Sequence, residues 1–145
     1  MIKEFVIDDF QKCSDLFVQV FNGAPWHDKW TTDTANKYLH ELIENNRFFG
    51  FTLWDNTVLV GTILCHAKNH YKGEEIFVDE LFVSPDYQRK GHGMELMDAV
   101  DNFAGENHFI SITLLTGKEK PSFYFFEKCG CKHLPYLAFM YKHIE

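Results

Sequence analysis

The sequence lacks long apolar runs, clusters of basic residues, internal repeats and low-complexity segments. No apolar stretch approaches the roughly 20 residues that a membrane-spanning helix needs, so no such helix is expected. The chain carries 14 Lys and Arg against 21 Asp and Glu, a formal net charge of −7, which disfavours binding to nucleic acids and to anionic membranes. Its first nine residues contain acids where a targeting segment would be apolar or basic, so we expect a cytoplasmic protein.

Cysteine is also scarce, with four residues: Cys13, Cys65, Cys129 and Cys131. In a cytoplasmic chain of this size they are expected to be free thiols rather than disulfides. The pair Cys129 and Cys131 has no second cysteine pair to match it, and His133 alone does not complete a tetrahedral set of ligands. No metal is therefore expected there.

Two histidines, His66 and His70, have the four-residue spacing of a metal site on a helix. A strand-like pattern precedes them and a glycine follows, so the helical argument fails. We therefore expect surface histidines and no metal centre.

Apolar and aromatic residues are abundant: 46% of the chain is hydrophobic, and 15 residues are Phe. This composition argues against disorder. Because a domain usually has about 100–200 residues, we expect residues 1–145 to form a single domain with a substantial core.

The spacing of the apolar residues divides the chain into helices and strands. Helices are expected from Phe10 to Phe21, from about Thr32 to Ile43, after Gly91, and from Pro121 to Lys128. Strands are expected in an opening segment that ends at Ile7, and at Phe48–Trp54, Val58–His66, Ile76–Val83, Ile110–Thr116 and Leu137–His143. The order βααβββαβαβ(β) predicts an α/β fold with one mixed central sheet flanked by helices.

The most informative segment runs from Val78 to Met94, where a strand leads through a short loop into a helix. Gly91 and Gly93 allow a tight turn and a close approach of the backbone to a ligand. Unpaired N–H groups at the helix start favour an anion, and Arg89 and Lys90 add two cations there. A pyrophosphate is the expected ligand.

Two familiar phosphate loops are excluded. A dinucleotide fingerprint needs a third glycine where Leu96 stands, and the Gly-Lys-Ser/Thr of a Walker loop is absent. Taken alone, the glycine pair leaves open a plain turn that only starts a helix.

The wider spacing Leu81-x-Val83-x-Pro85-x-x-Gln88-x-x-Gly91-x-Gly93 resembles the acyl-CoA signature of the GNAT N-acetyltransferase superfamily. The segment Ser122–Cys131 is similar to the late A-x-x-F-Y-x-K-x-G-F motif of that family, and the element order fits the whole chain. The nearest likeness is to polyamine and aminoglycoside acetyltransferases. The resemblance implies a GNAT domain in which acetyl-CoA lies where the strand before the loop splays from its neighbour.

The resemblance also implies which residues bind acetyl-CoA. The backbone of Leu81, Phe82 and Val83 would pair with the pantetheine arm, and one N–H would polarise the thioester carbonyl. The residues implied around the pyrophosphate are Gln88, Arg89, Lys90, Gly91, His92, Gly93 and Met94.

Asp79 and Glu80 lie at the mouth of this implied splay and are the candidate catalytic residues, as general base and as anchor of the substrate ammonium. An alkylamine with a pKa of about 10.4 is protonated at neutral pH and must lose a proton before it attacks. Because adjacent strand residues point to opposite faces, both acids can face the substrate only if a bulge intervenes. The alternative is that one of them forms a surface salt bridge.

The family's tyrosine, a candidate acid for the leaving thiolate, is replaced by Phe126. Tyr124 falls about 200° away around the helix, and Glu119 replaces a frequent asparagine. Three alternatives remain open for the leaving thiolate: it leaves without an acid, it takes a proton from another group such as Tyr141, or it takes one from a water.

The acceptor is expected to be cationic, because residues 1–83 have a net charge of −6 and residues 84–145 only −1. Trp26 and Asp28 lie in the segment where the family builds the floor of its substrate site, and are expected to bind the amine. Nearby Trp30 is expected to pack against the core.

The sequence thus predicts an acetyl-CoA-dependent N-acetyltransferase acting on a small polyamine- or aminoglycoside-like amine. Direct attack is expected, since no cysteine lies in a recognisable nucleophile setting. A non-catalytic acyl-CoA-binding or sensing module and a protein or peptide acetyltransferase remain as alternatives, and a homodimer is left open.

Overall fold

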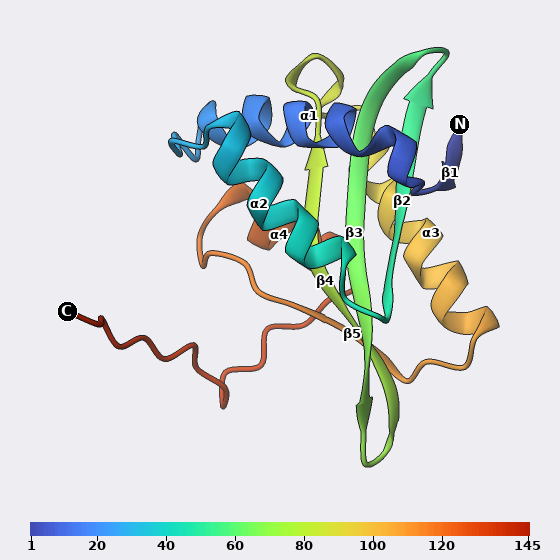
Figure 1. Cartoon of the computed structure of the whole chain (residues 1–145). Coiled ribbons are helices and arrows are strands. Elements are labelled where there is room, and N and C mark those ends of the chain that lie inside the picture. Colours follow the sequence, from blue (N-terminus) through green and yellow to red (C-terminus); the bar gives the residue numbers. More distant parts are fainter. The chain divides into compact units, whose positions relative to one another are not determined.

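The computed structural model describes residues 1–145, which form two compact units, Met1–Leu115 and Thr116–Glu145. The first unit contains a mixed sheet with the strand order β1-β2-β3-β4-β5 (Figure 1). Its strands are β1 (Ile2–Glu4), β2 (Phe48–Asp55), β3 (Val58–His70), β4 (Gly73–Val83) and β5 (Ser111–Leu114). Strands β1 to β4 pair antiparallel, and β5 pairs parallel with β4.

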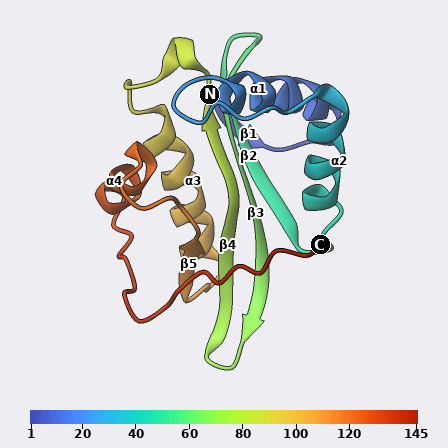
Figure 2. The same cartoon turned by 90° about the vertical axis from the view of Figure 1, so that its left-hand side faces the viewer.

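Helices cover both faces of this sheet. Helices α1 (Phe10–Asn22) and α2 (Thr32–Ile43) lie on one face and α3 (His92–Glu106) on the other, as Figure 2 shows with the sheet nearly edge-on. The core under α1 and α2 includes Phe17 and Leu39, both 1% exposed. Leu96 and Val100 of α3 are fully buried. Burial of these apolar stripes supplies the main driving force for this packing.

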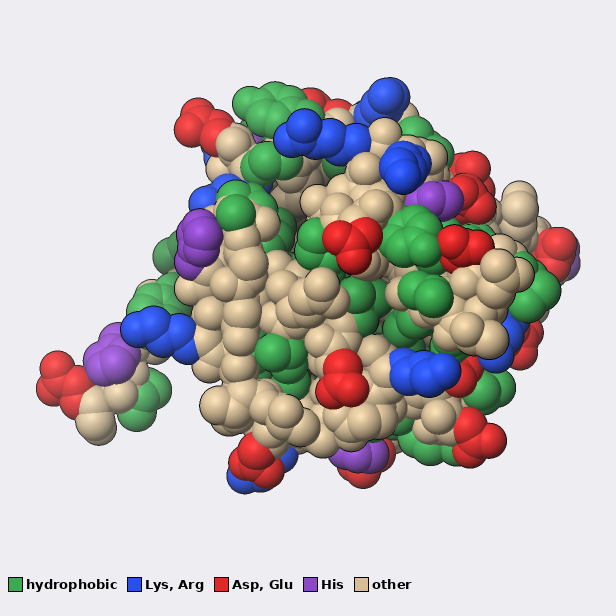
Figure 3. Space-filling view, turned by 90° about the horizontal axis from the view of Figure 1, so that it is seen from above, with side chains coloured by type: hydrophobic (Ala, Val, Ile, Leu, Met, Phe, Trp, Pro, Cys, Tyr) green, Lys and Arg blue, Asp and Glu red, His purple; other side chains and the backbone are tan.

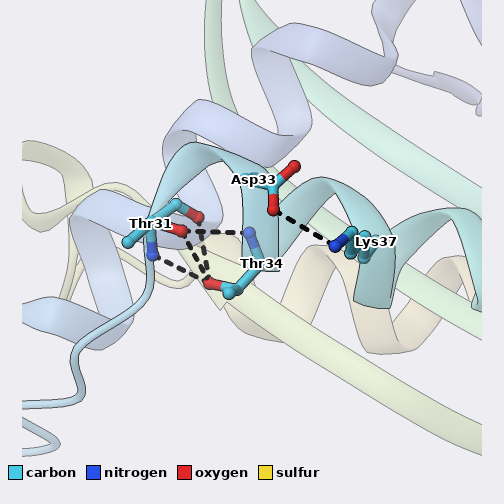
Figure 4. Close-up of polar contacts among 4 residues, drawn as sticks. All are labelled: Thr31, Asp33, Thr34 and Lys37. Carbon is cyan, nitrogen blue, oxygen red and sulfur yellow. Dashed lines mark hydrogen bonds and ion pairs between the residues drawn. The ribbon is translucent and has the colours of Figure 1, made fainter.

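A capping box fixes the start of α2 (Figure 4). The N–H of Thr34 donates to the Thr31 hydroxyl at 3.0 Å, and the N–H of Thr31 donates to the Thr34 hydroxyl at 2.9 Å. Asp33 and Lys37 add an exposed ion pair one turn apart, at 3.3 Å. Two N–H groups at the start of the helix, which have no partner within it, are thereby satisfied.

The second unit contains one helix, α4 (Pro121–Lys128), as predicted. The hydroxyls of Thr116 and Ser122 are hydrogen-bonded at 2.7 Å at its start. The predicted strand at Leu137–His143 is wrong, since no strand follows Leu114. An apolar run favours a strand only where a partner strand accepts its hydrogen bonds, and this unit contains no other strand.

The other predicted elements are present with boundaries shifted by a few residues, and β1 ends at Glu4 rather than Ile7. None of the helices is both long and apolar enough to span a membrane. His66 and His70 both lie in β3, and no group of three or more His, Cys, Asp or Glu side chains is arranged to hold a metal ion.

Candidate functional site

Strand β4 has an open edge over its last residues. Its pairing with β5 ends at Val78, opposite Leu114, whereas its pairing with β3 continues to Val83, opposite Gly61. The backbone groups of Asp79–Val83 that face away from β3 therefore have no partner strand. Such an edge can pair with an extended ligand by strand-like hydrogen bonds.

A β-bulge lies where this open edge begins. Leu64 pairs with Glu80 but the next residue, Cys65, pairs with Val78, so Asp79 is an extra residue in β4. The extra residue interrupts the alternation of side chains. Asp79 hydrogen-bonds a side chain of β3, and Glu80 hydrogen-bonds Tyr38 of α2. The bulge required for the two acids to share a face is present.

Beyond the bulge, Phe82 points to the same face as Glu80. Its side chain is 2% exposed and packs edge-on against Phe17 of α1, with ring centroids 5.5 Å apart. Phe21 lies 6.1 Å from it. Only the backbone of Phe82 is therefore available to a ligand.

Glu80 occupies a position that favours its neutral form. Burial raises the pKa of its carboxyl to about 7, and the negative charge of Asp79 acts in the same direction. A hydrogen bond from the Tyr38 hydroxyl opposes this rise, and the charge of Asp28 adds to it. Glu80 can consequently exchange a proton near neutral pH.

Asp79 is held by His66, which sequence reasoning placed on the surface. The carboxylate oxygen Oδ2 lies 2.7 Å from His66 Nδ1, and the side chains are only 13% and 23% exposed. Because an ionised carboxylate only accepts hydrogen bonds, Nδ1 carries the proton. The expectation of a surface position for His66 is wrong. Strand pairing brings its side chain beside Asp79, and this pairing cannot be predicted from the neighbouring residues alone.

Tyr38 of α2 is a second residue of the site to which the local sequence pattern does not point. Burial and the charge of Glu80 raise the pKa of its hydroxyl, which stays protonated and serves as a hydrogen-bond donor. Its ring stacks on Trp30 with centroids 5.4 Å apart. An amphipathic pattern indicates that such a residue is buried, but not which carboxylate its hydroxyl meets.

Trp30 packs against the core, as the sequence predicted. Its ring lies edge-on to Phe17 at 5.0 Å, and its backbone N–H and C=O both bond the Asn22 amide at 2.8 Å. Its indole N–H donates to Asp28 Oδ2 at 3.2 Å. Trp30 thus positions the exposed Asp28 carboxylate. The negative charge of Asp28 raises the pKa of the Glu80 carboxyl.

Trp26 lies further out on the same segment. Its half-buried ring is 5.7 Å from that of Phe21. The structure brings the charge of Asp28 close enough to Glu80 to raise the pKa of that carboxyl, whereas Trp26 contacts the neighbouring aromatic ring of Phe21. Asp28 and Glu80 thus lie beside a cluster of aromatic rings.

The loop after β4 ends in a left-handed turn. Gly91 has φ +83° and is the N-cap of α3, and no side chain caps the helix. No atom lies within 4 Å of the position of a Cβ on Gly91, so the backbone is open to a ligand. Gly93 lies within α3, and its φ is not positive, so of the two glycines only Gly91 makes the turn.

Side-chain bonds hold this loop in place. The Gln88 amide donates to the Val83 carbonyl at 3.0 Å, and the Tyr87 hydroxyl donates to Asp55 in β2 at 2.9 Å. Arg89 and Lys90 are exposed before the start of α3.

The first turn of α3 begins with His92, followed by Gly93 and Met94, all half-buried. His92 Nδ1 lies 2.8 Å from Glu95 Oε1. From above, Figure 3 shows acidic and basic side chains interspersed rather than a field of one sign. A local anion site is therefore set by backbone N–H groups and nearby cations rather than by the whole surface.

An open strand edge that leads to an uncapped helix start with two cations fits an extended ligand ending in a pyrophosphate. The acetyltransferase (GNAT) family model matches residues 6–131 of the sequence. The chain belongs to the GNAT acetyltransferase family. It is an N-acetyltransferase, and acetyl-CoA is the acetyl donor of this family. A comparison of the sequence with curated proteins finds no significant match.

Solved structures share the fold. An aminoglycoside acetyltransferase, meta-AAC0020, from an uncultured soil metagenomic sample superposes with a TM-score of 0.77 at 19% identity, over 100% of this chain and 96% of that one. A possible acetyltransferase from Clostridium difficile 630 has a TM-score of 0.84 at 16% identity, with coverages of 100% and 98%. AAC(6')-Iy, solved with a CoA bisubstrate analogue, has a TM-score of 0.78 at 17% identity, with coverages of 99% and 98%.

Proposed function

We propose that this GNAT protein, as a single acetyltransferase domain, transfers an acetyl group from acetyl-CoA to a primary amine of a small cationic substrate of the polyamine or aminoglycoside type. One observation carries the proposal: the bulge at Asp79 turns two neighbouring carboxylates to one face, beside the open edge of β4. A cationic amine needs such a site, because it must be bound as an ammonium and then deprotonated.

The chain's own groups would hold acetyl-CoA along β4 and the start of α3. The free backbone edge of Leu81–Val83 would pair with the pantetheine arm, and one of its N–H groups would stabilise the developing oxyanion. The open backbone at Gly91, the N–H groups of His92–Met94 and the cations Arg89 and Lys90 would hold the pyrophosphate. Acetyl-CoA supplies an activated thioester.

Glu80 fits the role of general base and Asp79 that of ammonium anchor. A base works best with a pKa near the working pH, and burial raises the pKa of Glu80 to about 7. Asp79 is tied to His66 and keeps its second oxygen for the amine. Glu80 would accept the ammonium proton, so that the free amine nitrogen can attack the thioester carbon. The carbon–sulfur bond would break as the nitrogen loses its second proton to water. Phe126 has no proton to give, so the thiolate would take one from water.

The acceptor would be a polycation. Asp28, held by Trp30, adds a third carboxylate to the same side, and the aromatic rings provide faces for a cation. The aminoglycoside acetyltransferase meta-AAC0020 was solved with sisomicin, which favours this substrate class here.

Amine-dependent thiol release from acetyl-CoA tests the proposal, with polyamines, aminoglycosides and lysine peptides as acceptors. We expect release with a polyamine or an aminoglycoside, and kcat/KM should rise with pH and level off above about 7. Glu80→Gln should lower kcat by about 10²- to 10⁴-fold with unchanged affinity for acetyl-CoA. The control is Glu41→Gln, on the exposed side of α2, which should leave both constants unchanged.

Other results would contradict the proposal in distinct ways. Release with peptides alone would indicate a protein acetyltransferase. Tight binding of acetyl-CoA without release by any amine would indicate a binding or sensing module. An unchanged kcat in Glu80→Gln would remove the assignment of the base.

A further inference from the structure

His66 joins β3 to the bulge of β4 through its side chain. In the sheet it stands opposite Phe77, with ring centroids 5.5 Å apart. The extra residue in β4 brings the Asp79 carboxylate back over this position, where Oδ2 meets Nδ1 at 2.7 Å. Both side chains are largely buried, so the contact is shielded from solvent and from salt.

The groups around this pair come from every element packed on that face. They are Glu80 on β4, Tyr38 on α2, Asp28 before α2, and Lys68, whose ammonium lies 5.5 Å from the Phe77 ring; the buried thiol of Cys65, the next residue in β3, also feels the charge of Asp79. Helix α1 contributes aromatic rings there, Phe17 and Phe21. Acids outnumber bases in this set, so the hydrogen bond from His66 to Asp79 is made within a mainly acidic group.

We propose that His66 is a positioning residue of the acetyltransferase site: its imidazole holds the Asp79 carboxylate against β3 and balances part of its charge, which leaves Glu80 as the carboxylate that exchanges a proton. The catalytic meaning of this role rests on the function proposed above. The contact itself does not, because it is made within the chain.

The physical argument concerns two carboxylates side by side. Like charges at short range keep one of the two groups protonated, and a neighbouring cation relieves this effect. When His66 is an imidazolium, the Asp79 charge is balanced and Glu80 ionises more readily. Without His66, the unbalanced Asp79 charge should hold the proton on Glu80.

The test follows the Glu80 carboxyl directly, by ¹³C NMR titration of the protein labelled at glutamate side chains, without acetyl-CoA or amine. In His66→Gln, which keeps an amide donor but no charge, the Glu80 midpoint should rise by about half a pH unit or more. Asp79→Asn should lower the midpoint. Adding His66→Gln to Asp79→Asn should then change nothing further.

The matched control is His70→Gln, in the exposed end of the same strand, which should leave the Glu80 midpoint unchanged. An unchanged midpoint in His66→Gln would overturn the proposal. If His66→Gln shifted the Glu80 midpoint equally in a protein that already carries Asp79→Asn, the proposal would also be overturned, because His66 would then act on Glu80 without Asp79.

Thiol release by the same variants separates this inference from the proposed function. If the function holds, the acid limb of kcat/KM should move with the NMR midpoint in His66→Gln. A moved midpoint in a protein that acetylates no amine would support the role of His66 and overturn the function. Release that continues with an unmoved midpoint would overturn the role of His66 alone.

Discussion

Glu80 connects the chemistry of the site to the stability of the fold. Burial, together with the charge of Asp79, raises the pKa of its carboxyl from 4.5 to about 7. The folded protein therefore binds this proton more tightly than the unfolded chain. The stabilising contribution is fully present below pH 4.5 and is lost as pH rises toward about 7.

Glu80→Gln should accordingly stabilise the protein at alkaline pH, since an amide has no charge to bury. The gain should grow by up to about 2 kcal/mol in the free energy of unfolding between pH 5 and pH 8. Urea unfolding of both proteins at these pH values measures it. A gain that does not depend on pH would show that burial of the charged form is not its source. The Glu41→Gln control should show no gain.

At the scale of elements, β4 combines two tasks. Its bulge places the Asp79 side chain beside His66, and its edge after Val78 extends beyond the end of its pairing with β5. The loop that follows leads directly into α3, whose first residues are uncapped. One strand–loop–helix segment therefore positions both the acids and the expected pyrophosphate site.

Gly91→Ala should weaken acetyl-CoA binding at this loop. With φ +83°, any Cβ strains the backbone by about 1–2 kcal/mol, and a methyl group occupies the space where a phosphate would approach. We expect at least a tenfold rise in the dissociation constant, measured by calorimetric titration. This rise corresponds to a loss of about 1.4 kcal/mol in the free energy of binding.

Gly130→Ala is the matched control for strain. Gly130 has φ +96° and equally open space around it, but it follows α4. It should lose comparable stability and bind acetyl-CoA normally. Equal affinity in the wild type and Gly91→Ala would remove the phosphate-loop assignment.

At the scale of the whole molecule, binding of acetyl-CoA should appear as added stability. A ligand at 100 times its dissociation constant stabilises a protein by about 2.7 kcal/mol, which corresponds to about 5–10 °C in Tm for a chain of this size. Thermal unfolding followed by circular dichroism measures the shift without any knowledge of the acceptor.

The comparison ligand is the acetyl thioester of N-acetylcysteamine, which has the reacting group but no pyrophosphate. It should raise Tm far less than acetyl-CoA at equal concentration. Equal shifts would locate the binding energy at the thioester end and contradict the anion site at α3.

The sequence by itself determined the elements and the family. Helical and strand periodicity located four helices and the strands of the sheet, because the spacing of apolar residues within a short segment indicates which face of a helix or strand is buried. The glycine loop and its cations, Arg89 and Lys90, were recognisable because these residues are neighbours in the chain. Asp79 and Glu80 were visible as a pair for the same reason.

Only the tertiary structure decided how that pair is used. The bulge at Asp79, its bond to His66 and the meeting of Glu80 with Tyr38 depend on strand register and helix docking. Those are set by residues far apart in the chain. The absent strand at Leu137–His143 has the same origin. An apolar run indicates that a segment can form a strand, and a hydrogen-bonding partner decides whether it does.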